Sequence, residues 1–212
     1  MGAAADSGHE YLLKQYLLTG KDDLANLEMC TSLPLPYRNL ALIRPPVDLL
    51  SMNDVLTRLL YVTPNRGLLY VTDSTSHLRN PTHGVEHLSC FFPGLLALGA
   101  HALPPTALPT RERELHAWAA QGLAQTCWLT YADSVARLGP DEMAMESGGR
   151  RWLEAVEEWE DEGRPGGRPP GVRDVLGATG GWKDYRATKT AYLLRPEVSA
   201  VLRLDLWGVR GC

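Results

Sequence analysis

The central apolar segment of this chain reads His87-Leu88-Ser89-Cys90-Phe91-Phe92-Pro93-Gly94-Leu95-Leu96-Ala97-Leu98-Gly99-Ala100. Residues 95–102 are apolar nearly all round, which predicts a helix buried on more than one side. Residues 88–108 contain no Asp, Glu, Lys or Arg and are long enough to suggest a membrane span. Prolines and glycines interrupt them, so we predict a buried helix followed by a loop.

The segments around this stretch have mainly helical patterns, with apolar residues recurring among good helix formers. The predicted helices cover residues 10–18, 22–29, 47–60, 111–138 and 151–162. Residues 68–72 predict one short strand, and the proline-rich residues 33–46 predict a connector. The run Gly-Arg-Pro-Gly-Gly-Arg-Pro-Pro-Gly at residues 163–171 predicts a surface loop or a disordered insert. These features indicate a mainly α fold.

The composition of the chain excludes some classes of function. The chain has 212 residues, 44% of them hydrophobic, a net charge of −4 and a pI near 5.9. It is long enough for one substantial core, and it lacks the clustered basic face that nucleic acid requires. No signal peptide is visible in residues 1–5, which have no charged or long apolar region. The four cysteines include no Cys-x-x-Cys pair, so spacing alone leaves their pairing open.

Four segments, in one order, resemble the class I α-1,2-mannosidases (glycoside hydrolase family 47), which trim mannose from N-glycans. The segments are Asp6-Ser7 running into Glu10-Tyr11-Leu12-Leu13-Lys14-Gln15, His87-Leu88-Ser89-Cys90-Phe91, Pro93 to Ala100, and Tyr192-Leu193-Leu194-Arg195-Pro196-Glu197. The resemblance implies an all-α fold, here a partial (αα)7 barrel. It makes residues 1–197 a partial catalytic domain that contains the insert near 163–171. Residues 198–212 form a divergent tail, because Val198-Ser199-Ala200-Val201 stands where the family has Thr-Val-Glu-Ser.

The same resemblance implies a reaction and its residues. The family hydrolyses terminal α-1,2-linked mannose of high-mannose N-glycans with inversion, which needs one carboxyl group as acid and another as base. Asp6 and Glu197 match catalytic positions of the family, Glu197 as the base. His87, Arg195 and Glu10 match positions at or near the sugar. Without the family, Asp6 would be interpreted as a helix N-cap, His87 as a structural histidine, and the other three as solvated charges.

The resemblance also implies a disulfide between Cys90 and Cys127, and therefore an oxidising compartment of the secretory pathway, the endoplasmic reticulum or Golgi. The bridge would close a loop of roughly 38 residues and stabilise the fold by about 4 kcal/mol. The family uses Ca²⁺, but its threonine ligand and its general-acid glutamate have no counterpart here. The chain alone is therefore predicted to be inactive. Asp141 stands where the family has a glutamate, and whether Asp141 or Glu142 faces substrate stays open.

Two alternatives compete with this interpretation. A relative that binds glycans without turning them over would keep the sugar pocket and lack hydrolysis. A zinc peptidase would use His83-Gly84-Val85-Glu86-His87 as a His-x-x-Glu-His pattern, with both histidines on one helix face. Pro81 and Gly84 argue against a stable helix there, and no third ligand is identifiable.

Overall fold

The computed structural model describes residues 6–21, 47–75, 80–173, 182–191 and 193. The predicted helix 22–29, the connector 33–46, Arg195, Glu197 and the tail 198–212 lie outside these residues. Among the described helices, none is both long and apolar enough to cross a membrane.

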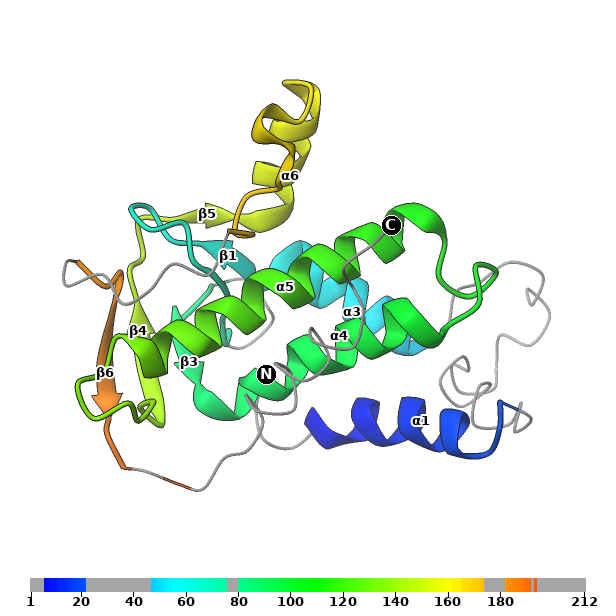
Figure 1. Cartoon of the computed structure of the whole chain (residues 1–212), viewed down its shortest axis with the longest axis horizontal. Helices are drawn as coiled ribbons and strands as arrows, with labels where there is room; N and C mark the ends of the chain where they lie inside the picture. The colour runs from blue at the N-terminus through cyan, green and yellow to red at the C-terminus, as the bar shows by residue number, and fades with distance from the viewer. Residues whose placement is uncertain (1–5, 22–46, 76–79, 174–181, 192, 194–212) are drawn as a thin grey trace.

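Five α-helices lie in the described part of the chain (Figure 1). They are α1 (Asp6–Leu18), α3 (Val47–Arg58), α4 (Phe92–Ala102), α5 (Thr110–Ala132) and α6 (Trp152–Asp161). Two short 3₁₀ helices, η2 (His87–Phe91) and η3 (Pro165–Gly167), complete the helical elements of this part. The helices predicted from residues 10–18, 47–60, 95–102 and 151–162 are confirmed within a few residues, apart from the start of α1.

The described chain also contains two small sheets, each of three antiparallel strands. In the first, β1 (Leu60–Val62) lies between β2 (Leu69–Val71) and β5 (Arg150–Arg151). In the second, β4 (Glu142–Met145) lies between β3 (Gly84–Glu86) and β6 (Tyr185–Lys189), with Ala144 opposite both Gly84 and Arg186. Of these strands the sequence predicted only β2. The all-α class is therefore too narrow, and the supported statement is a helical fold with two small sheets.

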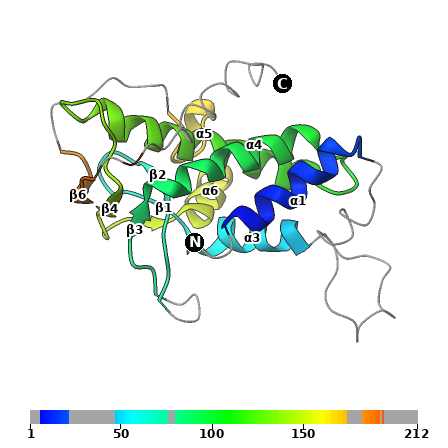
Figure 2. The same cartoon turned by 90° about the horizontal axis from the view of Figure 1, so that it is seen from below.

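The core lies where α4 and α5 run beside each other (Figure 2). Phe92, Leu95, Leu96 and Gly99 are buried along α4, a spacing of three to four residues that places them on one stripe. Leu56, Leu60, Leu69, Ala119, Leu123, Trp152 and Val156 extend this cluster from α3, the first sheet, α5 and α6. The prediction of a buried helix after His87 is confirmed.

The helix predicted over residues 111–138 is too long, since α5 ends at Ala132. Arg137 adopts a left-handed backbone conformation with φ of 57°. Its guanidinium donates to the carbonyl oxygen of Ala132 at 3.1 Å, which satisfies an acceptor at the helix end. Arg137 therefore caps the C-terminus of α5, which lies before the Gly139-Pro140 pair that was expected to end the helix.

Residues 163–171 form a surface loop, which was one of the two structures predicted for them. Two tryptophans of α6 hold it: the indole of Trp159 donates to Pro165 O and that of Trp152 to Pro170 O, both at 2.9 Å. Gly171 lies against Leu69 with φ of 83°, a conformation that glycine adopts without strain. The loop thus returns to the core at its end.

Candidate functional site

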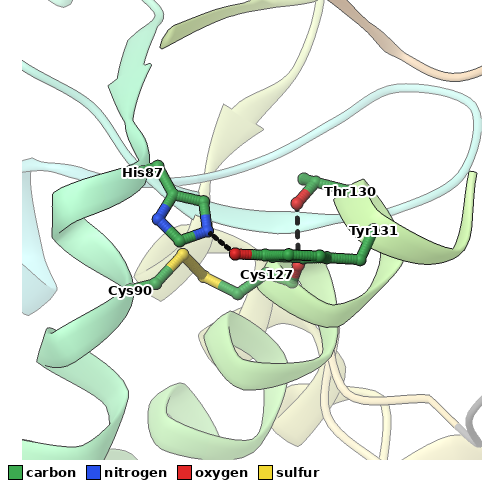
Figure 3. The surroundings of a disulfide bond; sticks show 5 residues. All are labelled: His87, Cys90, Cys127, Thr130 and Tyr131. Atoms are coloured by element: carbon green, nitrogen blue, oxygen red, sulfur yellow. Dashed lines mark hydrogen bonds between the residues drawn. A yellow bond between two sulfur atoms is a disulfide. The ribbon is translucent and has the colours of Figure 1, made fainter. Parts of the chain in front are cut away.

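The described candidate site centres on a junction between η2 and α5 (Figure 3). Cys90 on η2 and Cys127 on α5 form a disulfide, with their Cα atoms 6.0 Å apart. The predicted bridge is confirmed. It fixes the short helix that carries His87 against the long helix of the core.

His87 is buried, with 2% of its surface exposed. Its Nε2 atom and the hydroxyl of Tyr131 lie 2.7 Å apart, and the two rings meet edge to face at 5.3 Å. The backbone amide of His87 donates to Asp141 O at 2.8 Å, which ties the start of η2 to the start of β4. The structure therefore fixes the imidazole through Tyr131. Contact between His87 and a sugar stays a prediction.

Two carboxylates at the start of β4 share one cation. Lys189 on β6 places its Nζ 2.7 Å from Asp141 and 3.1 Å from Glu142. Hydrogen bonds to Asp141 and Glu142 raise the pKa of Lys189. Asp141 is buried and Glu142 is half-buried. Both candidates for the family's glutamate position therefore bind the same ammonium group, a partner that the sequence did not indicate.

A second polar cluster joins the end of α5 to the loop after β1. The guanidinium of Arg66 pairs with Asp133, whose side chain is fully buried. Tyr185 donates its hydroxyl to the same carboxylate at 3.1 Å, and Lys183 donates to Asp133 O at 2.9 Å. Burial, followed by the charge of Asp133, raises the pKa of Tyr185, so the phenol keeps its proton.

Asp184 anchors the segment that leads into β6. Its carboxylate accepts hydrogen bonds from the amides of Asn65 at 3.1 Å and Arg66 at 2.6 Å, and from Asn65 Nδ2 at 2.9 Å. Burial opposes ionisation, yet these hydrogen bonds together lower the pKa of Asp184. The residue has φ of 60°, which Asp tolerates better than most side chains.

A pocket of about 520 Å³ opens beside this anchor, at the far end of β4 from His87. Its lining includes Glu146 and Ser147 after β4, and Trp182, Lys183 and Arg186 around the start of β6. Trp182 is 69% exposed, unusual for so large an apolar ring. This pocket could not be predicted from the sequence, because its two walls lie almost forty residues apart in the chain.

The zinc-peptidase pattern is not a metal site in this structure. Gly84–Glu86 forms strand β3, so His83 and His87 do not share a helix face. His83 Nδ1 lies 2.7 Å from the Tyr70 hydroxyl, and the Nε2 of His87 is engaged by Tyr131. In the part of the chain that the structure describes, no three His, Cys, Asp or Glu residues gather around one point.

Comparison with known proteins supports the family that the order of the motifs indicated. The family model described as glycosyl hydrolase family 47 matches residues 1–201. The chain belongs to this family.

Curated proteins similar to this family 47 chain include mannosyl-oligosaccharide 1,2-alpha-mannosidase IC of Homo sapiens, 32% identical over 148 residues, or 70% of this chain and 19% of the relative. Mannosyl-oligosaccharide alpha-1,2-mannosidase IA of Spodoptera frugiperda is 31% identical over 142 residues, 66% of this chain and 17% of the relative. The endoplasmic reticulum mannosyl-oligosaccharide 1,2-alpha-mannosidase of Homo sapiens is 31% identical over 141 residues, 66% of this chain and 16% of the relative. The match spans less than a fifth of each relative.

The predicted site of this family 47 chain is described only in part. Asp6 and Glu10 lie on α1, whose backbone the structure places beside α4. Arg195 and Glu197 lie outside the described residues, so their convergence with His87 stays a prediction. In the part of the chain that the structure describes, no group of three or more His, Cys, Asp or Glu side chains is placed to hold a metal ion such as the Ca²⁺ expected from the family.

Proposed function

We propose that this chain is part of an α-1,2-mannosidase catalytic domain that removes terminal α-1,2-linked mannose from high-mannose N-glycans with inversion. The family match over residues 1–201 carries the proposal. The Cys90–Cys127 bridge, which the motif order implied, supports the alignment around His87. In this proposal residues 1–197 form the partial domain and residues 198–212 a divergent tail.

In the proposed reaction Glu197 takes a proton from the attacking water, and Asp6 stands at the family's second catalytic position. Inversion requires the acid and base carboxyl groups to lie about 6.5–9.5 Å apart, with water between them. Glu10 and Arg195 hold the sugar. His87, which Tyr131 holds in place, lies next to it. The leaving oxygen needs a proton from a glutamate that this sequence lacks, so the chain binds glycan without cleaving it.

The proposed architecture is part of an (αα)7 barrel. The pairing of α4 with α5, and of α1 with α4, supports it, since a helical barrel is built from neighbouring helix pairs (Figure 2). The proposed location is the endoplasmic reticulum or Golgi. The disulfide supports that location, because such bridges persist in oxidising compartments.

Titration of the 212-residue chain with the disaccharide Man-α-1,2-Man tests the proposal. We expect binding, no release of mannose, and weaker binding of Man-α-1,6-Man. Glu197→Gln should weaken binding of the α-1,2 disaccharide, whereas Glu157→Gln, an exposed change on α6, should not. Release of mannose by the chain alone would contradict the inactivity. Equal binding of both linkages would contradict the specificity.

The non-catalytic alternative has one observation in its favour, the replacement of the family's Thr-Val-Glu-Ser by Val198-Ser199-Ala200-Val201. Sequencing the gene on both sides of the coding region, and translating it in all frames, distinguishes a mannosidase domain from a non-catalytic relative. If a general-acid glutamate and the threonine are encoded nearby, a protein that includes them should release mannose. Binding without release by that longer protein would favour the alternative.

A further inference from the structure

The pocket at the far end of β4 has the make-up of a sugar-binding site. Trp182, 69% exposed, is part of its lining, so much of the indole is accessible to a ligand. The face of a pyranose ring carries C–H groups, and an aromatic ring provides a flat apolar surface for them. A concave site with one aromatic platform and a few polar groups is a usual form of small-ligand site.

The polar lining suits a neutral ligand rich in hydroxyl groups. Glu146 and Asp184 are anionic, and Lys183 and Arg186 are cationic, so the formal charges of these four cancel. Glu146, Ser147 and Arg186 are exposed and combine acceptors with donors. A sugar hydroxyl both donates and accepts, whereas an anion accepts only. The mixture therefore fits a saccharide better than phosphate or nucleic acid.

The pocket wall is held in place before any ligand binds. Asp184 accepts three hydrogen bonds from Asn65 and Arg66, and Tyr185 donates to the buried Asp133. These contacts fix the backbone on the C-terminal side of Trp182. A wall that is already ordered loses less conformational entropy when it binds, which favours a weakly binding ligand such as a sugar.

We propose that Trp182, with Glu146, Ser147 and Arg186, forms an accessory subsite for a second hexopyranose unit of the oligosaccharide. The inference rests on the proposed glycan substrate. The subsite is separate from the His87 junction, since β4 runs between them and a strand advances about 3.3 Å per residue. An oligosaccharide with several sugar units that reaches both places binds more tightly than one that reaches a single place.

The test follows the indole ¹H–¹⁵N signals of the chain, which has six tryptophans. The probe is a free high-mannose oligosaccharide with nine mannose units. We expect the Trp182 signal to shift saturably, and Trp182→Ala to weaken affinity about fivefold to tenfold. Trp128→Ala is the matched control, because Trp128 is also exposed, at 36%, but lies on α5 outside the pocket lining. It should bind like the unchanged chain.

Oligosaccharide binding that Trp182→Ala leaves unchanged would overturn the subsite while the mannosidase proposal stands. Cellotetraose, a glucose oligomer, tests the case in which the subsite exists but the proposed mannose function is wrong. If cellotetraose shifts the Trp182 signal and the mannose oligosaccharide does not, the subsite holds and the proposed mannose function fails. Displacement of either sugar by millimolar sulfate at constant ionic strength would contradict the saccharide assignment and identify an anion site.

Discussion

At the residue scale, the buried His116 makes the stability of this chain depend on pH. His116 on α5 is fully enclosed, and its Nε2 lies 3.4 Å from Asn53 Oδ1. Burial, assisted by the charge of Arg113, lowers the pKa of His116 to about 4. The folded protein therefore holds the imidazole neutral at a pH where the unfolded chain binds a proton.

We predict that the free energy of unfolding falls by about 2 kcal/mol through His116 between pH 7 and pH 5. The pKa is lower in the folded state, so the unfolded state binds more protons. The contribution is complete above the ordinary histidine pKa near 6.5 and is lost as the pH falls toward 4. Denaturant unfolding at several pH values measures it. His116→Gln should flatten the dependence, and His101→Gln, at an exposed position, should leave it unchanged.

The disulfide provides a second prediction at this scale. Cys90→Ala/Cys127→Ala should lower the free energy of unfolding by about 4 kcal/mol, because the open chain has more conformational entropy. A reducing agent should produce a similar loss in the unchanged chain and no further loss in the double variant. If reduction destabilises the double variant as well, a different bridge supplies the stability.

At the element scale, the short strands depend on close backbone contacts. A Cβ atom on Gly149 would lie 2.0 Å from the carbonyl oxygen of Val62, in the strand that pairs with β5. Backbone cannot yield as a flexible side chain does, so β5 would have to move. The neighbouring Gly148 has room, since its Cβ would meet Pro64 at 3.7 Å.

We therefore predict that Gly149→Ala lowers the free energy of unfolding by about 1–3 kcal/mol. The adjacent Gly148→Ala should change it by less than about 0.5 kcal/mol, as expected for an exposed site with space. Denaturant titrations of both variants under one condition measure the difference. Equal stabilities would show that the β1–β5 pairing adjusts without cost.

At the scale of the whole molecule, α1 presents apolar side chains to solvent. Tyr11 is 70% exposed and Leu18 is 82% exposed, and they lie seven residues apart, on one side of the helix. In a helical barrel such a face would lie against a neighbouring helix. An exposed apolar face of this kind promotes self-association.

We predict that the isolated chain associates at micromolar concentration, and that Tyr11→Gln/Leu18→Gln shifts it toward monomer. Gln15→Ala, an exposed change on the same helix, should have no effect. Sedimentation velocity across a concentration series measures both. A monomeric unchanged chain would mean that the α1 face is covered or too small to drive association.

The relation between sequence and structure differs among these scales. The helices α1, α4 and α6 and the strand β2 could be predicted, because helix formers, apolar spacing and turn residues act over a few neighbours. The strands β3, β4 and β6 could not, since segments of three to five residues show too little alternation. Their stability comes from pairing with strands distant in the sequence.

The family and the buried helix α4 follow from the sequence, through motifs whose residues lie close together in the chain, and the resemblance to that family implied the Cys90–Cys127 bridge. The folded structure was needed to show that Arg66 and Tyr185 meet at Asp133, that Lys189 holds Asp141 and Glu142, and that Trp182 borders a pocket. Those contacts join residues from separate elements. Their energy depends on distance and burial, which exist only once the chain has folded.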